Sequence, residues 1–498
     1  MTVMESTRWR DLVAALPELS KAFINGAYIN AASGETMPCV SPVSGETLNH
    51  IAACGDEDVN RAVAAARSGF EDGRWCDLAP RARKRLLLAF AQQLLDHGDE
   101  LAALMTVDMG KPITSAEWEV GYSAECLQWF AEALDHIYGE VAPLGPKALG
   151  TITREPVGVV GAITPWNYPL LMPIWKIGPA LGAGNTIILK PAEQSSLVAV
   201  RLGELASAAG IPDGVFNVVT GTGEAAGQAL ARHEDVDAVT FTGSTAVGRL
   251  IMGYAAQSNL KKVSLELGGK SPNIVLADAA SLDAVATRAA FGIFQNTGQV
   301  CSAGSRLLVD RSVADELVEK VVRAAADWQP ADPFDPQTTM GSMVDETQMR
   351  RVLSYIDVGR SEGATVGLGG SRVLEETGGF YVEPTVLRNV DNGMRVAREE
   401  IFGPVLSVLT FEDEEAALRL ANDTAYGLVA AVWTRDINKA HWFARRVRAG
   451  SVWINGYEEG DISLPHGGFK QSGFGRDTSL HAFDNYTQQK VTVINLTG

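Results

Sequence analysis

Apolar positions in the middle of the chain recur with two different periods. Short runs rich in Val, Ile and Leu, such as "NTIILKPA" and "VDAVTFTGS", alternate with longer segments in which every third or fourth residue is apolar, such as "SSLVAVRLGELASAAG". The first pattern is typical of buried strands and the second of amphipathic helices. Strands that alternate with helices predict an α/β fold with a parallel, doubly wound sheet, whose ligand sites lie at the carboxyl ends of the strands.

The flanking regions continue these patterns. Upstream, the sequence predicts a β region over 22–42, helices over 56–70, 81–110 and 123–139, and strands within 150–167. Downstream, it predicts a second α/β alternation over 281–363, a late strand over 450–455 and a β-like tail over 486–496 that is suited to pairing with another subunit.

Composition narrows the class of protein. The chain of 498 residues exceeds the size at which one core stops growing, so two or three domains are expected. Apolar residues make up 46% and charged residues 20%, as in ordinary globular proteins. The formal net charge of −18 argues against a nucleic-acid partner, and it favours cationic small molecules only weakly, since acidic balance mostly reports solubility.

The five cysteines are few and unpatterned, and no CxxC occurs, so neither a disulfide framework nor a zinc or other metal site is predicted. The first residues mix both charge signs without an apolar core, unlike a secretory signal. No apolar run reaches the roughly 18 residues of a membrane span. A cytoplasmic protein without a membrane partner is therefore expected.

The stretch "FGIFQNTGQVCSAGSR" places Cys301 among small and amide residues, with no histidine nearby. A thiol attacks as its thiolate, which is the minor form at neutral pH unless the surroundings favour it. An isolated cysteine is more often a small buried hydrophobe than a nucleophile, so both interpretations stand at this point.

Two turns after predicted strands are suited to phosphate binding. "TGTGEAAG" has the spacing GxGxxxG, which is weak support for a dinucleotide site. "FTGSTAVG" is the better candidate, because Gly243 permits close approach and Ser244 opens a helix whose N–H groups face an anion. In "LKPAE", Glu193 follows Lys190 past a strand end. Such a carboxylate accepts from ribose hydroxyls and repels a 2′-phosphate, which favours NAD over NADP, although a solvated loop pair is the plain alternative.

Three further residues have side chains suited to catalysis or binding. Asn167 lies in the proline-bracketed turn "TPWNYP", where a fixed amide donor suits an oxyanion hole, or where it serves only as an Asx-turn residue. Glu266 in "LELGGKSPN" follows apolar residues, which would raise its pKa as a general base requires, or it is a salt-bridged core carboxylate. Glu400 in "EEIFGPV" adds a second carboxylate beside Phe402.

Taken together, these strings resemble the aldehyde dehydrogenase family, since "TPWNYPL", "LKPAE", "FTGSTAVG", "ELGGKSPNIV", "GQVCSAGSR", "EEIFGPVLSV", "ANDTAYGL" and "GGFKQSGFGRD" occur in that family's order. The resemblance implies two doubly wound parallel-sheet domains plus a small β oligomerisation arm, in a homodimer or homotetramer. The implied division is an N-terminal extension (1–19), a discontinuous NAD-binding domain (20–131 and 152–267), a catalytic domain (268–478) and the arm (132–151 and 479–498).

The resemblance also assigns roles by position. Cys301 matches the nucleophile, Glu266 the general base and Asn167 the oxyanion-hole amide, with Lys190 as a further catalytic candidate. The implied NAD-binding set is Thr164, Pro165, Trp166, Asn167, Lys190, Ala192, Glu193, Gly223, Gly227, Phe241, Thr242, Gly243, Ser244, Val247, Glu266, Leu267, Gly268, Cys301, Glu400 and Phe402. The implied reaction is oxidation of an aldehyde to its acid through a thiohemiacetal and a thioester on Cys301.

Within the family, "WQPADPFDPQTTMG", "AVWTRD", "AGSVWINGYEEGD" and "GRDTSLHAF" look most like the γ-glutamyl-aminobutyraldehyde and 4-guanidinobutyraldehyde dehydrogenases. Acidic residues and an aromatic wall at the substrate tunnel would suit an ω-amino or ω-guanidino aldehyde. The candidates are Asp108, Tyr168, Trp175, Phe294, Glu458, Asp461 and His466. The acidic residues in "GYEEGDISLP" are equally consistent with a solvated loop.

Alternatives remain. His466, Gln295 and Leu267 depart from the patterns of close relatives, and the first two make the tunnel more polar than a trimethylammonium cage requires. Uncharged aliphatic or aromatic aldehydes are the main alternative substrate class. A CoA-acylating dehydrogenase is disfavoured by the presence of Glu266, and a non-catalytic relative by the joint presence of the candidate catalytic residues.

Overall fold

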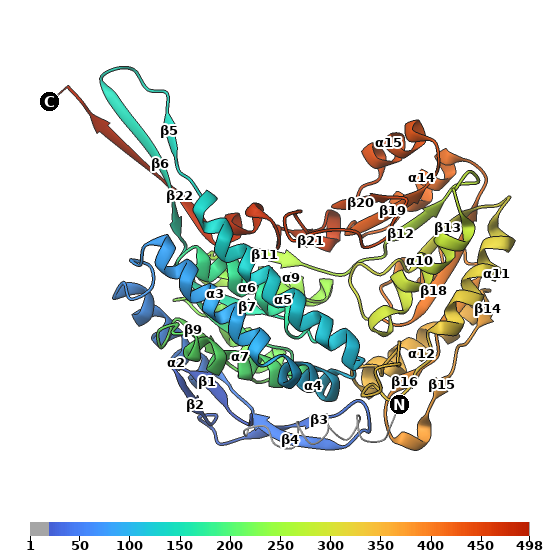
Figure 1. Ribbon diagram of the computed structural model, residues 1–498, viewed down its shortest axis with the longest axis horizontal. Coiled ribbons are helices and arrows are strands. Elements are labelled where there is room, and N and C mark those ends of the chain that lie inside the picture. The colour runs from blue at the N-terminus through green and yellow to red at the C-terminus, as the bar shows by residue number, and fades with distance from the viewer. Residues whose placement is uncertain (1–18, 498) are drawn as a thin grey trace.

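The computed structural model describes residues 19–497, which form two lobes and a projecting arm (Figure 1). The first lobe is built on an eight-stranded sheet. Its strands are β1 (Ala22–Ile24), β2 (Ala27–Ile29), β7 (Val159–Ile163), β8 (Thr186–Lys190), β9 (Phe216–Val218), β10 (Ala238–Thr242), β11 (Lys262–Glu266) and β21 (Gly473–Phe474). The spatial order is β2-β1-β9-β8-β7-β10-β11-β21, in which β9 to β11 are parallel and the edges antiparallel.

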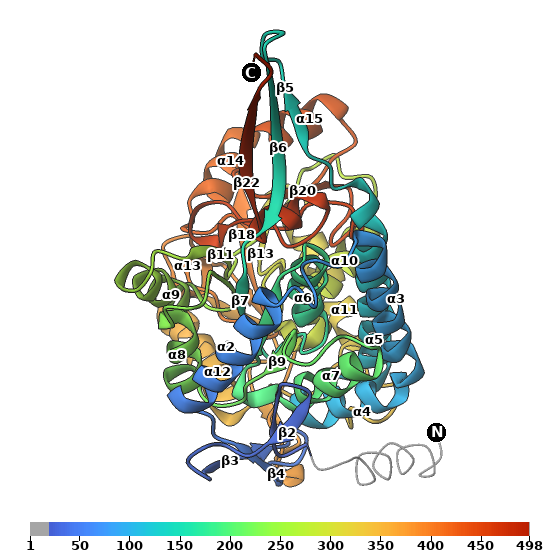
Figure 2. The ribbon, with the colours of Figure 1, turned by 90° about the vertical axis from the view of Figure 1, so that its left-hand side faces the viewer.

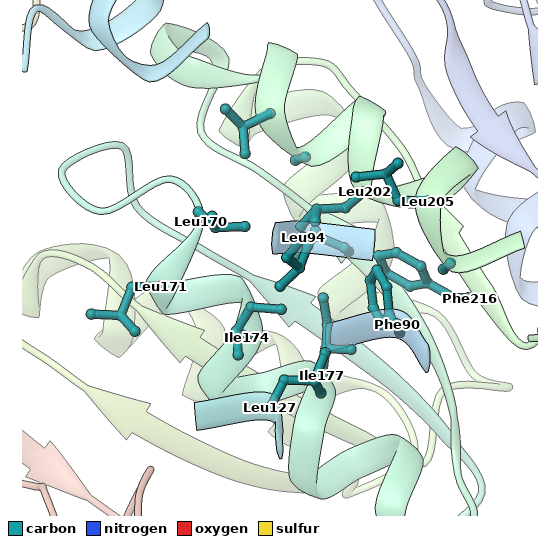
Figure 3. Close-up of a cluster of buried hydrophobic side chains, with 14 of the residues drawn as sticks. Phe90, Leu94, Leu127, Leu170, Leu171, Ile174, Ile177, Leu202, Leu205 and Phe216 are labelled. Carbon is teal, nitrogen blue, oxygen red and sulfur yellow. The ribbon is translucent and has the colours of Figure 1, made fainter. Parts of the chain in front are cut away.

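Helices cover both faces of this sheet. One face carries α2 (Asp56–Glu71), α8 (Gln228–Arg232) and α9 (Thr245–Gln257); the other carries α6 (Leu171–Gly182) and α7 (Leu197–Ala208), with α3 (Pro80–Asp96), α4 (Gly98–Met109) and α5 (Ile113–Ala133) outside them. Figure 3 shows how α6 is buried: Leu170, Leu171, Ile174 and Ile177 lie among apolar side chains of the neighbouring helices. Because α6 follows directly on the turn that holds Asn167, this burial helps to fix one side of the candidate site.

The second lobe is built on a seven-stranded sheet in the order β14-β17-β18-β13-β12-β19-β20. Its strands are β12 (Pro272–Val275), β13 (Arg306–Asp310), β14 (Thr365–Leu368), β17 (Thr385–Arg388), β18 (Val405–Phe411), β19 (Val429–Trp433) and β20 (Ser451–Ile454). One face packs on α10 (Leu282–Phe294) and α11 (Ala314–Ala324), the other on α12 (Glu346–Ser361), α13 (Arg395–Arg398), α14 (Glu414–Asn422) and α15 (Ile437–Arg446). The predicted α/β class is therefore confirmed.

The arm is a three-stranded antiparallel sheet of β5 (Glu140–Ala142), β6 (Ala148–Pro156) and β22 (Thr487–Asn495). It projects away from both lobes (Figures 1 and 2). Strand β6 pairs with β22 as far as Pro156, so it runs past the expected boundary at residue 151. None of the helices within residues 19–497 is both long and apolar enough to cross a membrane.

Short elements complete the described chain. Two small hairpins pair β3 (Thr36–Val40) with β4 (Thr47–Ala52) and β15 (Arg372–Val373) with β16 (Tyr381–Val382). Single helical turns are η1 (Leu134–His136), η2 (Glu193–Ser195), η3 (Gly223–Gly227), η4 (Gln295–Gly298), η5 (Ala325–Asp327), η6 (Glu375–Thr377), η7 (Lys470–Ser472) and η8 (Leu480–Asn485).

Two helix predictions were wrong in their bounds. The helix expected over 81–110 is divided at His97 into α3 and α4, because the apolar pattern of two helices that pack on one core continues across a break. The helix expected from 123 begins at Ile113 instead. Its first turns contain the charged Glu119, which is fully buried, so a polar residue on the inner face interrupted the apolar pattern.

The core predicts a contrast between two adjacent leucines of α3. Leu94 is fully buried in the largest apolar cluster, whereas Leu95 is 52% exposed. Leu94→Ala should lower the free energy of unfolding by about 2–5 kcal/mol, since it leaves a cavity. Leu95→Ala should change it by about 0.5 kcal/mol or less. Urea titrations followed by circular dichroism would measure both, and equal effects would contradict this placement of α3.

Candidate active site

The loop that carries Cys301 is held from several sides. It follows η4, where Asn296 and Thr297 both have left-handed backbone angles (φ 47° and 56°). Downstream, the amide of Gly304 donates to the carbonyl of Gly292 at 2.9 Å, and the buried Tyr457 hydroxyl donates to the Ser302 carbonyl at 2.6 Å. A nucleophile on so constrained a loop keeps a fixed position relative to its neighbours.

The turn between β7 and α6 brings Asn167 to this loop. Asn167 is 3% exposed, and its Nδ2 donates to the Gln299 carbonyl at 2.8 Å, two residues before the cysteine. In return, Nδ2 of Asn296 donates to the Asn167 carbonyl at 3.0 Å. An amide nitrogen carries two protons, so one remains to be donated elsewhere.

Glu266 ends β11 and is 4% exposed. Within residues 19–497, neither of its carboxyl oxygens has a hydrogen-bond partner. Burial raises its pKa well above the usual value, the negative charge of Asp477 adds to this, and the charges of Lys176 and Arg476 oppose it. These surroundings agree with the pKa direction expected from the sequence and favour the neutral acid.

The Cys301 thiol lies among carboxyl groups. Burial raises its pKa, the charges of Glu400, Glu266 and Glu458 raise it further, and the amide of Ser302 opposes them. That these three carboxylates act on one thiol also shows that the structure brings residues from distant strands together. These surroundings favour the protonated thiol, and its deprotonation becomes easier whenever one of these negative charges is neutralised.

Gly268 and Gly269 connect the parts of this site. A Cβ at Gly268 would lie 2.1 Å from Oε2 of Glu400, and one at Gly269 would lie 2.4 Å from the Cys301 carbonyl oxygen. The Gly269 amide donates to Oε1 of Glu400 at 3.0 Å. Burial raises the pKa of Glu400 to about 7, and this amide opposes the shift. Any side chain at Gly268 or Gly269 would therefore clash with Glu400 or with the backbone of Cys301.

Strand ends of the first lobe present the groups expected to bind a dinucleotide. Lys190 ends β8 and its Nζ lies 3.1 Å from Oε2 of Glu193. Ser244 caps the 13-residue helix α9, and its hydroxyl accepts from the amide of Val247. The first N–H groups of α9 therefore lie at the carboxyl end of β10, where they can bind an anion. The buried hydroxyls of Thr164 and Thr242 have no partner among the described residues.

The remaining members of this set lie around the same strand ends. The Trp166 and Phe402 rings meet edge to face at 5.2 Å, and Phe402 has a left-handed backbone (φ 59°). Leu267 fills the space over Gly248, beside the half-exposed Val247. The rest lie on β10 or on the segments that follow β7, β8, β9 and β10: Pro165, Ala192, Gly223, Gly227, Phe241 and Gly243. Unpartnered hydroxyls, a capped helix start and glycine-lined space fit a bound NAD.

Glu458 is the candidate substrate residue whose charge acts on Cys301. It follows β20 with a left-handed backbone (φ 56°), and its carboxylate accepts from Nε2 of Gln295 and, at 2.6 Å, from the Ser302 hydroxyl. Burial raises the pKa of Glu458 to about 7, while the Ser302 hydroxyl and the Arg288 charge oppose the shift. Both hydrogen-bond donors are neutral, so the carboxylate can still accept a cation.

The other candidate substrate residues differ in where they lie. Burial raises the pKa of Tyr168, and Glu458 and Cys301 raise it further, which puts Tyr168 near both. Trp175 packs against His466 with ring centroids 5.3 Å apart. Burial lowers the pKa of His466, which favours the neutral ring. Asp461 is exposed and acts on the pKa of Tyr122.

Two of the predicted substrate residues are buried. Asp108 is 1% exposed and accepts from the Cys39 thiol at 2.9 Å and from the Leu197 amide at 3.0 Å. Phe294 is fully buried in the apolar core under α10. Both were predicted from their chemistry alone. Asp108 contacts Cys39 and the start of α7, whereas Phe294 shares its apolar cluster with Val300 and Ala303 of the cysteine loop.

Sequence reasoning missed several residues of the site. Tyr457 anchors the cysteine loop, and a buried ion pair joins Lys176 of α6 to Asp477 beside Glu266. Lys176 did carry a signal, because a lysine within the apolar "LLMPIWKIGPAL" is costly to bury unless it is paired.

Residues 28–492 match the aldehyde dehydrogenase family, and the chain belongs to that family. It is 49% identical over 489 residues to the NADP/NAD-dependent aldehyde dehydrogenase PuuC of Escherichia coli, covering 98% of each chain. Two solved structures align with it over 99% of this chain and 99% of their own chains. The γ-glutamyl-γ-aminobutyraldehyde dehydrogenase of Burkholderia cenocepacia is 55% identical with a TM-score of 0.97, and the indole-3-acetaldehyde dehydrogenase AldA of P. syringae, bound to NAD⁺ and IAA, is 53% identical with a TM-score of 0.98.

The charges around Cys301 predict how its reactivity depends on pH. Glu458→Gln removes one negative charge, so it should lower the thiol pKa and raise the rate of iodoacetamide alkylation at pH 8.5 by up to about tenfold. Glu459→Gln is the matched control, since Glu459 pairs with Arg288 and is not among the groups that shift this pKa. Mass spectrometry of the Cys301 peptide would measure the rates. Equal rates in both variants would contradict the proximity of Glu458.

Proposed function

We propose that this chain oxidises an aldehyde to its carboxylic acid with NAD, by covalent catalysis on Cys301. The observation that carries the proposal is the convergence of Cys301, Asn167, Glu266 and Glu400 around Gly268 and Gly269. After the thiol proton passes to water, the Cys301 sulfur adds to the carbonyl carbon and the C=O π bond opens. The resulting oxyanion accepts from the free Asn167 N–H and the Cys301 amide. One such donor contributes about 3–4 kcal/mol to transition-state stabilisation.

NAD, when bound, supplies the acceptor for the hydride that leaves the former carbonyl carbon. In the second half of the reaction, Glu266 takes a proton from water, the oxygen attacks the thioester carbon, and the C–S bond breaks with Cys301 leaving as a thiolate. Because its pKa is raised, Glu266 must first lose its own proton, so this half is expected to accelerate as pH rises.

Lys190 and Glu193 would hold the adenosine ribose, the start of α9 the pyrophosphate, and Glu400 the nicotinamide ribose. The Glu193 carboxylate, 36% exposed, supports a preference for NAD, since it repels a 2′-phosphate. The NAD⁺-bound AldA relative points the same way, whereas the name of the PuuC relative includes both cofactors. The arm, on which Val491, Val493 and Leu496 are each about 60% exposed, supports a homodimer or homotetramer. The cytoplasm is the expected location.

The substrate we propose is an ω-amino or ω-guanidino aldehyde. Glu458 supports this choice, because its carboxylate lies beside Cys301 and is held by two neutral donors. Tyr168 and Trp175 add aromatic surface that suits a cationic chain. The Burkholderia relative is named for an aminoaldehyde, while the equally similar AldA is named for an aromatic one, so the residues around Cys301 decide between them.

The base role of Glu266 predicts a stalled intermediate. Glu266→Gln should give a burst of about one NADH per active site followed by slow turnover, because the thioester forms but its hydrolysis lacks a base. Stopped-flow absorbance at 340 nm would follow it. Cys301→Ala is the companion variant and should give neither burst nor acid. An unchanged steady-state rate in Glu266→Gln would refute the base role, and acid formation at the native rate in Cys301→Ala would refute the whole mechanism.

The cation preference predicts a selective loss. Glu458→Gln should lower kcat/KM for 4-aminobutyraldehyde about tenfold or more, since a hydrogen bond to a charged group contributes about 1.5–3 kcal/mol. Butyraldehyde should be affected much less, and it reports any general effect on the thiol. Glu459→Gln is again the control. If the unaltered enzyme prefers butyraldehyde to 4-aminobutyraldehyde, the proposal of a cationic substrate is refuted and an uncharged aldehyde becomes the expected substrate.

A further inference from the structure

A buried carboxylate caps the helix that follows the Asn167 turn. The amides of Leu170 and Leu171, at the start of α6, both donate to Oε1 of Glu119 at 3.0 Å. These amides belong to the first turn of a helix, where no backbone acceptor exists. Glu119 comes from α5 and is fully buried, so it fastens the start of α6 to a neighbouring helix.

Lys111 neutralises this carboxylate from inside the protein. Its Nζ forms an ion pair with Oε2 of Glu119, and the two side chains are 1% and 0% exposed. The same Nζ lies 3.9 Å from the centroid of the Tyr168 ring, one residue after Asn167. The pair therefore contacts the Asn167 turn at Tyr168, Leu170 and Leu171.

The turn that carries Lys111 is also linked, through Ser342 and Val344, to the Gln299 carbonyl that accepts from Asn167. Gly110 has a left-handed backbone (φ 80°), and its carbonyl accepts from the Ser342 amide at 3.2 Å. The segment that follows holds Gln299, because the Val344 amide donates to its Oε1 at 2.9 Å. The Gln299 carbonyl in turn accepts from Asn167. One short turn of the first lobe thus supports both the backbone that carries Asn167 and the carbonyl that orients its amide.

The geometry points to Glu119 and Lys111 as positioning residues that set the oxyanion amide of Asn167 against Cys301. This inference rests on the proposed function, in which Asn167 is the donor. Neither residue touches the reacting atoms. A buried pair in which one partner is lost leaves an uncompensated charge, whereas replacement of both partners leaves none. The role in positioning can therefore be separated from a contribution to stability.

Two double variants make that separation. Lys111→Met with Glu119→Gln removes both charges and keeps an amide oxygen for Leu170 and Leu171. Lys111→Met with Glu119→Met removes both charges and the acceptor as well. All variants are made in the Glu266→Gln background, in which an NADH burst is expected. We expect the burst of the second double variant to be at least about tenfold slower than that of the first, with the aldehyde KM changed much less, since a displaced donor weakens the transition state. Equal bursts would overturn the inference.

A cycle with Asn167→Ala provides the decisive comparison. If the pair acts through Asn167, loss of the cap should add little to the loss already caused by Asn167→Ala, whereas a general defect in folding would multiply the two losses. Glu132→Gln, an exposed site on the same helix, is the control and should leave the burst unchanged. If the Met pair fails to fold, Glu119→Asp with Lys111 retained replaces it, because the shorter side chain draws the acceptor away from the amides.

The outcomes keep the two proposals apart. Native activity in Asn167→Ala and Cys301→Ala would mean that the proposed function is wrong. Loss of activity in those variants, together with multiplicative losses in the cycle, would mean that the function stands and the positioning role does not.

Discussion

The site depends on a steric constraint at Gly268 and Gly269. These residues follow Glu266 at the end of the first sheet, and the chain passes there into the second lobe. Glu400 lies against one glycine and the Cys301 backbone against the other, at distances that leave no room for a Cβ beside either neighbour. Glu266, Cys301 and Glu400 can share so small a volume only because these two residues have no side chains.

Burial disfavours ionisation throughout this volume. Cys301, Glu266, Glu400 and Glu458 all have raised pKa values, and desolvation is the first cause in each case. The three carboxylates also raise the pKa of Cys301, whereas nearby cations oppose the shifts of the carboxylates themselves. A cationic group that enters, whether a substrate ammonium or the nicotinamide ring of an oxidised cofactor, would relieve several of these penalties at once. Binding of a cationic ligand is therefore expected to lower the pKa values of Cys301 and its neighbouring carboxyl groups.

Much of the fold could be predicted from local pattern, and the residues that were missed show why the rest could not. The strand ends at Lys190, Thr242 and Glu266 follow from apolar runs interrupted by glycine or polar residues, and the structure has them there. The burial of Asp108 was not predicted because its partner Cys39 is distant in sequence. Glu119 escaped notice for the same reason, since a charged residue has no visible reason to be buried until Lys111 and the start of α6 are in place.

The pairing of β6 with β22 has a consequence for how the molecule is made. Strand β6 leaves the ribosome before most of the first sheet and all of the second, yet its partner follows both lobes in the chain. Through most of translation, β6 therefore presents an unpaired hydrogen-bonding edge, of the kind that promotes association between incomplete chains. Synthesis of β22 is what closes that edge, so nascent molecules stalled just before it should be the most prone to aggregate.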